Sequence, residues 1–471
     1  MSFSRNISEE KIITVEIKDV SAEGYGVGKL EDGKIVFVEN CLRGEVVEAT
    51  LQKNRKNYCE AKLKRVLKPS VYRVGPQCAH FGLCGGCRLQ HSDYSEQLYI
   101  KTKIVKDALE RIGKQFVDVI FPIEGSEKVY DYRNKLEYAF TNRAWLSTEE
   151  IQTGETFDRR GVGFHLPGNY AAVLDINRCH LMEISNQIKN EIKAFAIKND
   201  YSFFDIKQKK GLLRSLLIRR TNIGEIMTLV AYYEPDEMKI NLLMEHLATN
   251  FPFITSLQYV INSKANDSIY DLEPVVFKGT AYITEQLGRF RFLIGATSFF
   301  QTNTLQAEKL YTIAKNFAQL TGNENVYDLY CGVGSITLFI SDACRHVAGI
   351  EQSKQAIEDA KKNASLNKIE NVSFYCGDVG LLLKEEFISK HGTPDVIITD
   401  PPRAGMQKEV IHSLLNIKAR RIVYVSCNPA TQARDIGLLS ESYDLKAVQP
   451  VDMFPQTMHV ENVALLELKE A

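Results

Sequence analysis

The strongest constraint on the fold is a regular alternation of apolar strand-like runs and helical segments that begins near residue 286. The runs are NVYDLY, HVAGIE, VSFYCGD, DVIITDPP and RIVYVSC, with helical segments between them. Strands that alternate with helices in this way form a parallel sheet with helices on both faces. We therefore predict an α/β, Rossmann-like domain over residues 286–471.

Acidic residues stand at the ends of these predicted strands, where open α/β sheets bind their ligands. Asp328 precedes a turn that contains Gly332 and Gly334, and Glu351 and Asp378 end the next two strands. The acid precedes the glycines and a third glycine is missing, which argues against NAD and for S-adenosylmethionine. Glu351 is placed for ribose hydroxyls and Asp378 for an adenine edge. Each acid alone is more often a helix N-cap, and three on successive strands favour a cofactor site.

Two polar motifs follow the fourth and fifth predicted strands. Asp400 opens DPPRAG, in which the prolines stiffen the loop and remove two hydrogen-bond donors. Cys427 lies in VSCNPAT, on a tight polar turn directly after the apolar run RRIVY. A lone cysteine is usually a core residue, so the case for chemistry at Cys427 depends on these neighbours.

The first part of the chain has a different pattern. Short alternating runs over residues 11–68, separated by glycine-bearing turns, predict four or five strands of an OB-like β-barrel within residues 1–68. The end of this region is basic, with Glu60 as the one acid. It is open whether this is an edge strand protected by lysine or a patch that contacts RNA phosphates. The eight basic residues are Lys53, Arg55, Lys56, Lys62, Lys64, Arg65, Lys68 and Arg73.

Residues 69–285 form the third predicted unit, a central α+β domain. The strand-like pieces DYRNKLEYAF, GLLRSLLIRR and EIMTLVAYY occur together with the helical segment SEQLYIKTKIVKDALERIG. Neither a repeat nor a low-complexity tract interrupts them. The chain is therefore expected to be multidomain, with boundaries near residues 68 and 285.

Four cysteines of this central region form a candidate metal site. Cys78, Cys84 and Cys87 lie in CAHFGLCGGC, and Cys179 follows at a distance in DINRCH. Glycine between cysteines lets the backbone approach the sulfurs closely. Zinc sites favour two short cysteine pairs, whereas three clustered cysteines with one remote cysteine are typical of [4Fe–4S] proteins. The spacing leaves both metals open and favours the cluster.

The N-terminal sequence, the length of the apolar stretches and the net charge limit the class of protein. The start, MSFSRNISEEKI, shows no apolar leader, and no stretch approaches the roughly 18 apolar residues of a membrane span. We expect a cytoplasmic protein, in which the ten cysteines are thiols or ligands rather than disulfides. The net charge is −1, so affinity for RNA has to come from local patches.

Taken together, these motifs resemble the RNA uracil-5-methyltransferases, specifically the 23S rRNA branch. The N-terminal barrel is similar to a TRAM domain, and the cysteines resemble the [4Fe–4S] ligands of that branch. DLYCGVG, DPPRAG, SCNP and HVENVALL occur in the order of the family. The resemblance covers almost the whole chain and is loosest between Cys87 and Cys179.

The resemblance implies specific roles. Cys427 matches the nucleophile and Glu461, in HVENVALL, matches the base, with His459 as the first alternative for the base. C5 of uracil is too weakly nucleophilic to attack a methyl sulfonium, so a thiolate has to add to C6 first. A base then removes the C5 proton. The residues implied to bind S-adenosylmethionine are Gln301 in SFFQTN, Tyr330, Glu351, Asp378 and Asp400.

The expected partner is an RNA, with rRNA first and tRNA second, and the expected state is a monomer that needs neither a membrane nor a protein partner. A non-catalytic RNA-binding or assembly factor is the main alternative, against which the intact Cys427 and Glu461 argue. A radical tRNA-modifying enzyme is a second alternative. It would need a C-x₃-C-x₂-C cluster, which the sequence does not contain.

Overall fold

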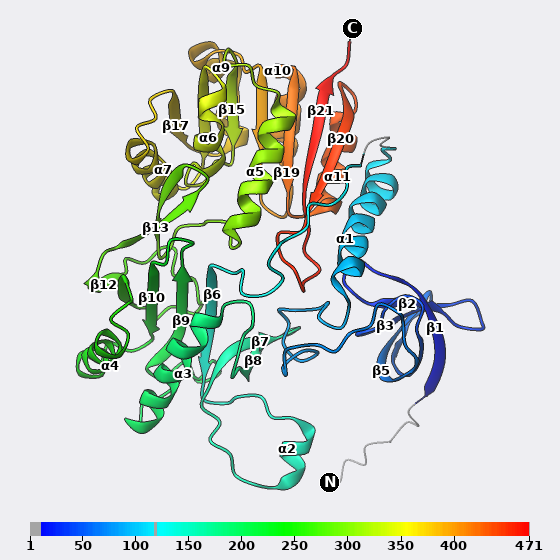
Figure 1. The fold of residues 1–471 in the computed structure, drawn as a ribbon, viewed down its shortest axis with the longest axis vertical. Helices are drawn as coiled ribbons and strands as arrows, with labels where there is room; N and C mark the ends of the chain where they lie inside the picture. The colour runs from blue at the N-terminus through cyan, green and yellow to red at the C-terminus, as the bar shows by residue number, and fades with distance from the viewer. Residues whose placement is uncertain (1–10, 117–119, 471) are drawn as a thin grey trace.

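Figure 1 shows the fold in a computed structural model, which describes residues 11–116 and 120–470. A small closed barrel, a seven-stranded central sheet and a seven-stranded C-terminal sheet follow one another along the chain. A two-stranded hairpin, β13 (Tyr282–Leu287) and β14 (Phe290–Gly295), links the two large sheets. None of the helices in the described ranges is long and apolar enough to cross a membrane.

The N-terminal barrel has five strands, within the four or five that the alternation predicted. They close in the order β1-β2-β3-β5-β4, and the alternate residues that point inward form a separate small core, which includes Val15, Ile17 and Val36. The strands are β1 (Ile12–Val20), β2 (Gly26–Lys29), β3 (Ile35–Val38), β4 (Val46–Asn54) and β5 (Tyr58–Lys68).

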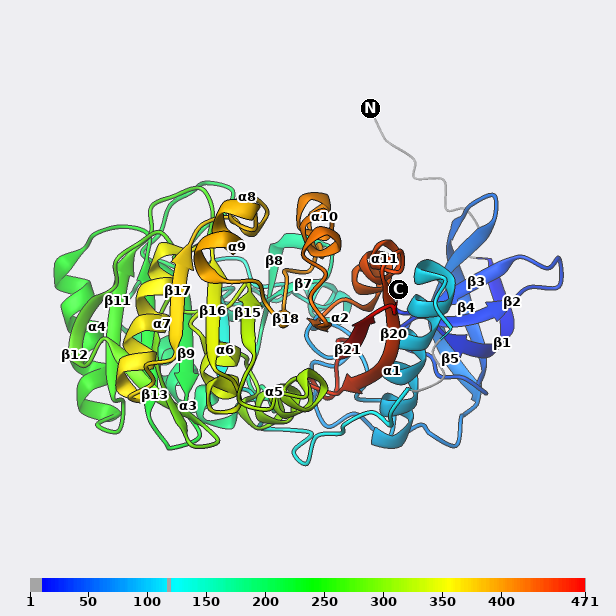
Figure 2. The ribbon, with the colours of Figure 1, turned by 90° about the horizontal axis from the view of Figure 1, so that it is seen from above.

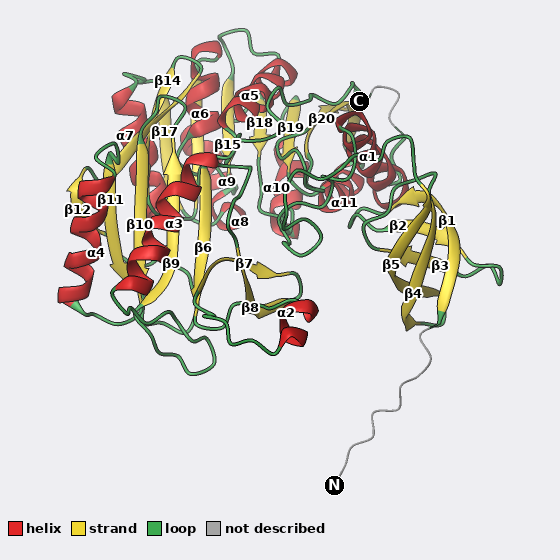
Figure 3. Cartoon of the chain, turned by 60° about the horizontal axis from the view of Figure 1, so that its bottom comes forward, coloured by secondary structure: helices red, strands yellow, loops and turns green. Residues whose placement is uncertain are grey.

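The central sheet is mostly antiparallel, in the order β12-β11-β10-β9-β6-β7-β8. Two helices, α3 (Glu183–Lys198) and α4 (Glu237–Asn250), cover one face (Figure 3). The other face, which includes Leu217 and Leu229, joins the core of the C-terminal sheet. The strands are β6 (Lys135–Thr141), β7 (Gly161–Leu166), β8 (Asn169–Asp175), β9 (Leu213–Arg220), β10 (Ile226–Tyr232), β11 (Ser256–Ile261) and β12 (Val275–Gly279); the short α2 spans Thr148–Thr153.

The C-terminal sheet contains the predicted parallel strands with helices on both sides, in the order β17-β16-β15-β18-β19-β21-β20. This confirms the α/β prediction. The parallel strands are β15 (Asn325–Leu329), β16 (His346–Glu351), β17 (Val372–Cys376), β18 (Val396–Thr399) and β19 (Arg421–Ser426). The helices are α5 (Thr304–Ala318), α6 (Ser335–Ile340) with a 3₁₀ turn at Ser341–Ala343, α7 (Lys354–Leu366), α8 (Val379–Leu382), α9 (Glu385–His391), α10 (Lys408–Ile417) and α11 (Pro429–Leu439).

Two further strands complete this sheet in a way that the βα alternation did not predict. β21 (Glu461–Leu468) inserts antiparallel between β19 and β20 (Tyr443–Val451). Ser426 at the end of β19 is paired with Asn462 near the start of β21. The chain that follows His459 is therefore brought back beside the end of β19.

Helix α1 (Tyr94–Ala108), which continues as a π-helical turn at Leu109–Gly113, lies in the central part of the sequence but packs on α11 and β20 (Figure 2). A buried ion pair fixes this position: Nζ of Lys101 lies 2.5 Å from Oδ1 of Asp452, and both side chains are fully buried. In space, α1 thus belongs to the C-terminal sheet and stands between that sheet and the barrel.

Candidate active site

Cys427 lies at the point where β19 ends and α11 begins. The side chain of the next residue, Asn428, caps the helix by accepting a hydrogen bond from the backbone of Ala430 at 3.1 Å. The Asn428 amide also donates to the carbonyl of Arg403 at 2.9 Å, and the Thr431 hydroxyl donates to the same carbonyl at 3.2 Å. The DPPRAG loop and the VSCNPAT turn are therefore tied together at the edge of the sheet.

Glu461 reaches the same place from β21. Because Ser426 is paired with Asn462 in an antiparallel ladder, Glu461 lies beside the turn that holds Cys427. Its side chain is buried, and Oε2 has no hydrogen-bond partner within the described part of the chain. The pKa of Glu461 is raised to about 8, mainly by burial and also by the nearby Asp400, with Arg403 opposing the rise.

The thiol and two carboxyls share one electrostatic environment. The pKa of Cys427 is raised to about 11, mainly by burial and also by the charges of Glu461 and Asp400, against the lowering effect of the charge and hydrogen bond of Arg403. The pKa of Asp400 is raised to about 7, mainly by burial and also by the charge of Asp328. Arg403 is thus the cation that favours the charged forms of both Cys427 and Glu461. Sequence reasoning gave Arg403 no role, although it stands in the quoted DPPRAG motif.

His459, the alternative base, lies on the loop that leads into β21. The pKa of its imidazole is lowered to about 4, mainly by burial and also by the cations Arg403, Lys101 and Arg133. Its backbone NH donates to the hydroxyl of Thr457 at 3.2 Å. The imidazole is therefore neutral at pH 7. None of the groups that shift its pKa is an acid.

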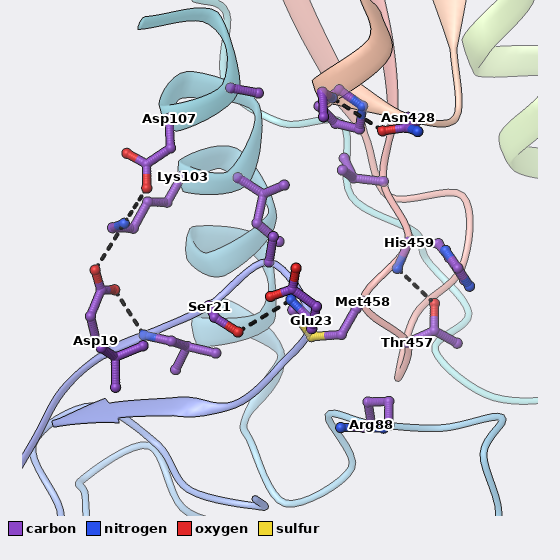
Figure 4. Close-up of a pocket in the computed structure, with 18 of the residues that line it drawn as sticks. Asp19, Ser21, Glu23, Arg88, Lys103, Asp107, Asn428, Thr457, Met458 and His459 are labelled. Carbon is purple, nitrogen blue, oxygen red and sulfur yellow. Dashed lines mark hydrogen bonds and ion pairs between the residues drawn. The ribbon is translucent and has the colours of Figure 1, made fainter. Parts of the chain in front are cut away.

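A cleft of about 730 Å³ opens onto Cys427 between the barrel, α1 and the loop before β21 (Figure 4). Its walls carry both signs of charge. Lys103 on α1 pairs with Asp19 of the barrel at 2.9 Å and with Asp107 one turn on at 2.5 Å. The remaining charged residues of the lining are Glu23, Arg88, Arg111 and Arg403, and the neutral His459 also lines it.

The glycine turn after β15 lies beside this site. Gly332 has φ of 55°, and a Cβ placed there would find no protein atom within 4 Å. Its backbone NH donates to Oε2 of Glu351 at 3.3 Å, and Oε1 of Glu351 accepts from the backbone of Ser353 at 2.8 Å. The turn therefore presents backbone to open space at the carboxyl edge of the sheet.

Of the other residues predicted to bind S-adenosylmethionine, Tyr330 follows β15, Asp378 follows β17 and Asp400 follows β18, whereas Gln301 precedes α5. Tyr330 directly follows β15 with φ of 65°, and burial together with the charges of Asp378 and Glu351 raises the pKa of its hydroxyl. Asp378 caps α8 by accepting from the backbone of Leu381 at 3.1 Å, so the N-cap interpretation also holds for this acid. Gln301 is buried, and its backbone carbonyl accepts from the Asn134 amide at 2.8 Å.

The four predicted metal ligands line one largely apolar cavity of about 260 Å³, and all four are free thiols. They are Cys78, Cys84, Cys87 and Cys179. Within the described ranges, no group of three or more His, Cys, Asp or Glu side chains is placed to hold a single metal ion. Four soft thiol ligands around one cavity have the donor chemistry of both iron–sulfur clusters and zinc sites.

The basic run near the end of the barrel is partly neutralised. Arg73 is bonded to both carboxylate oxygens of the buried Glu45 and to the carbonyl of Asn40 at 2.8 Å, so this member of the predicted RNA patch has a structural role. Lys53 pairs with Glu60 at 2.7 Å, and Lys64 and Arg65 pair with Glu48. The members that remain exposed outside these pairs are Arg55, Lys56, Lys62 and Lys68.

Comparison with known proteins agrees with this geometry. Residues 9–64 match the TRAM domain, and residues 275–469 match the family described as tRNA (Uracil-5-)-methyltransferase. A protein named as an uncharacterized RNA methyltransferase from Bacteroides thetaiotaomicron is 48% identical over 96% of this chain and 100% of its own length. The chain belongs to the RNA uracil-5-methyltransferase family. It is an RNA (uracil-C5)-methyltransferase, and the S-adenosylmethionine dependence of this family agrees with the glycine turn.

Other relatives of this methyltransferase extend over the same length. A second protein named as an uncharacterized RNA methyltransferase, from Porphyromonas gingivalis, is 47% identical over 96% of the chain and 99% of its own length. The crystal structure of the Pyrococcus abyssi tRNA (uracil-54, C5)-methyltransferase in complex with S-adenosyl-L-homocysteine has a TM-score of 0.72 at 27% identity. That structure is matched over 96% of this chain and 100% of its own chain. The family and the TRAM domain that the motifs implied are therefore confirmed.

Proposed function

We propose that the enzyme methylates C5 of a specific uridine in 23S rRNA through a covalent adduct between Cys427 and C6 of the target base. The observation that carries the proposal is the meeting of a thiol, a buried carboxyl and a guanidinium at adjacent strand ends. The open glycine turn beside them supplies room for the methyl donor.

The proposed steps balance in electrons and protons. The Cys427 thiolate adds to C6, and the electron pair of the C5–C6 double bond moves toward O4 as an enolate. C5 then takes the methyl group from S-adenosylmethionine, which leaves as S-adenosylhomocysteine. The Glu461 carboxylate removes the proton from C5, the C6–S bond breaks, and the C5–C6 double bond and the thiolate are restored.

The electrostatic coupling supports the roles of Cys427 and Glu461 in this order. The negative charge of Glu461 raises the pKa of Cys427, so the two groups are hard to ionise together. Formation of the S–C6 bond removes the charge from sulfur. A charge that would oppose ionisation of Glu461 is then gone at the stage where a carboxylate base is needed.

We assign the methyl donor to the strand ends around Gly332. Glu351 would accept from the ribose hydroxyls and Asp378 would reach the adenine edge, while Gln301, Tyr330 and Asp400 would border the remaining parts of the molecule. The carboxylate of Glu351 supports this role because its partners are backbone NH groups, which leave lone pairs on both oxygens.

We assign the four-cysteine cavity to a [4Fe–4S] cluster held by Cys78, Cys84, Cys87 and Cys179. When bound, the cluster would add iron–thiolate bonds between parts of the chain that are distant in sequence, so metal binding would contribute to folding. Anaerobically purified protein should contain iron and sulfide. Stoichiometric zinc without iron would contradict the assignment.

The four-cysteine set supports rRNA as the substrate, because it is the feature that resembles the rRNA branch. A tRNA is the second candidate, which the Pyrococcus abyssi neighbour favours, since its name specifies uracil 54 of tRNA. In either RNA the target uridine has to leave its stack to reach Cys427. We further propose a cytoplasmic monomer. Mapping 5-methyluridine in rRNA and tRNA from a deletion strain separates the two substrates.

The decisive experiment uses Cys427→Ala, Glu461→Gln and their double mutant. Cys427→Ala should abolish methyl transfer but still bind S-adenosylmethionine, whereas Glu461→Gln should accumulate a protein–RNA adduct that survives denaturing electrophoresis. The adduct should be absent from the double mutant. Cys376→Ala, which removes an exposed cysteine at the end of β17, is the matched control and should turn over normally. Turnover by Cys427→Ala would exclude the nucleophile role, and normal turnover by Glu461→Gln would move the base role to another residue, with His459 first.

A further inference from the structure

The short segment Tyr132–Asn134, just before β6, contacts the loop that leads to Glu461 and the residues Gln301 and Thr302. The Tyr132 hydroxyl donates to the carbonyl of Pro455 at 2.9 Å, in the loop that leads to Glu461. Asn134 donates from its amide to the carbonyl of Gln301 at 2.8 Å, and from its backbone to the carbonyl of Thr302 at 2.9 Å. The residue between them, Arg133, lies with its guanidinium carbon 5.7 Å from the centre of the Phe454 ring.

Arg133 also lines the four-cysteine cavity. Its backbone NH donates to the carbonyl of Leu181 at 2.9 Å, two residues after Cys179. One residue therefore lines the cavity that contains the four thiols and also contacts the Phe454 ring.

The Nε donor of Arg133 is not engaged by the described residues, in contrast to donors of other cations near the thiols. Arg178 pairs with Glu183 at 3.0 Å, and the buried Lys189 is bonded to the carbonyl of Ile176 and to Asn190. Nε of Arg133 is buried and has no hydrogen-bond partner within residues 11–116 and 120–470. A buried guanidinium nitrogen without an acceptor is costly unless a negative group balances it.

We propose that Arg133 is a positioning residue, which balances the negative charge of the thiolate-bound cluster and thereby holds the loop from Asp452 to Val460 against the active site. The inference rests on the cluster assigned above and adds a link between that cluster and the loop before Glu461. Negative charge in the cavity would hold the Arg133 guanidinium in place, with one face of its plane against the Phe454 ring. The loop that leads to the base is then fixed by the occupied cluster site.

The test compares iron-loaded Arg133→Met with iron-loaded Arg178→Met, which removes the same charge from the same cavity lining. Outer-shell partners of metal ligands typically contribute 10–100-fold to metal affinity, so Arg133→Met should release iron to a chelator roughly 10–100 times faster than wild type. The reduction potential of its cluster should fall, because a nearby positive charge favours the reduced state. Arg178→Met should change both measurements much less, because the Arg178 side chain is mostly exposed and paired with Glu183, so solvent screens its charge.

Hydrogen exchange of the peptide over residues 452–460 gives the second measurement. Exchange should be faster in iron-loaded Arg133→Met than in Arg178→Met. Phe454→Leu should speed exchange in this loop while iron release stays at the wild-type rate. Arg133→Lys keeps a charge but loses the flat guanidinium, so it should retain iron better than Arg133→Met and still loosen the loop. If Arg133→Met does not fold, Arg133→Lys and Phe454→Leu decide.

Two failures are distinguishable. Wild-type protein that binds no iron would overturn the cluster assignment and this inference together. Wild-type protein that binds iron, with Arg133→Met equal to Arg178→Met in iron release, potential and loop exchange, would overturn only the role of Arg133.

Discussion

In the free enzyme the Cys427 thiol should ionise at a much higher pH than an ordinary cysteine. Its pKa is raised from 9.0 to about 11, so at about pH 9 roughly 1% is thiolate, against about half for an unperturbed thiol. The thiolate population is therefore roughly fifty times smaller. A thiolate of higher pKa is a better nucleophile, which recovers roughly eightfold. Cys427 should thus exchange with a neutral disulfide roughly six times more slowly than an unperturbed thiol of equal access.

Charge-removing variants should shift this ionisation in directions that the geometry fixes. Glu461→Gln and Asp400→Asn each remove a carboxylate that raises the pKa of Cys427, so the midpoint should fall in both. Arg403→Met removes the cation that lowers it, so the midpoint should rise. The difference in Cys427 reactivity between Glu461→Gln and wild type should shrink below about pH 8. The pKa of Glu461 is about 8, so below this pH the wild-type carboxyl is itself protonated and uncharged. Glu467→Gln, on the same strand but paired with Arg421, is the control and should have no effect.

The assay needs neither RNA nor S-adenosylmethionine. Protein is exposed to a small neutral aromatic disulfide across a pH series, and modification of the Cys427 peptide is followed by mass spectrometry. The exposed Cys376 on the same chain reports the behaviour of the reagent. A Cys427 midpoint at or below about pH 9, or a midpoint that Glu461→Gln and Asp400→Asn leave unchanged, would refute the coupling of these three groups.

Three further outcomes follow from other parts of the structure. Lys101→Met should lower the free energy of unfolding in urea by about 3–5 kcal/mol, because Asp452 is left buried and unpaired, and Asp452→Asn added to it should recover part of the decrease. Gly332→Ala should weaken S-adenosylmethionine binding in calorimetry and cost about 1–2 kcal/mol of stability through its positive φ. Arg55→Gln with Lys62→Gln should flatten the salt dependence of RNA binding by about 0.7 in log–log slope for each phosphate that is no longer neutralised. Unchanged stability of Lys101→Met, normal S-adenosylmethionine affinity of Gly332→Ala, and an unchanged salt slope for Arg55→Gln with Lys62→Gln would each contradict the corresponding expectation.

Much of the C-terminal domain could be predicted because its signals are local. Each apolar run, with its own turn residues, specifies one strand, and parallel strands bring their carboxyl ends to one edge of the sheet. Asp328, Glu351 and Asp400 could therefore be expected at one edge from the order of the strands alone. The five barrel strands were predictable for the same reason, since alternation over a few residues is also a local signal.

Interactions between distant segments could not be predicted in this way. The position of α1 depends on Lys101 and Asp452, which are 351 residues apart, and neither segment alone indicates the pairing. The run of basic residues at the end of the barrel can be read from the sequence, but the sequence does not show that one of them, Arg73, is bound to Glu45. The antiparallel insertion of β21 is equally non-local, and it is this insertion that places Glu461 beside Cys427.

The raised pKa of Cys427 has a consequence for how the reaction starts. Among the charged groups that shift the pKa of this thiol, only Arg403 favours the thiolate, so the free enzyme keeps Cys427 protonated at neutral pH. A protonated thiol reacts slowly with oxidants and electrophiles, so a nucleophile at Cys427, as proposed, would be protected while no RNA is bound. In the proposed mechanism activation has to come with the substrate: the thiol proton leaves to solvent as the sulfur forms its bond to C6 of the uracil. Burial and the carboxyls of Glu461 and Asp400, which raise the pKa of Cys427, thus keep the thiol protonated until the substrate is bound.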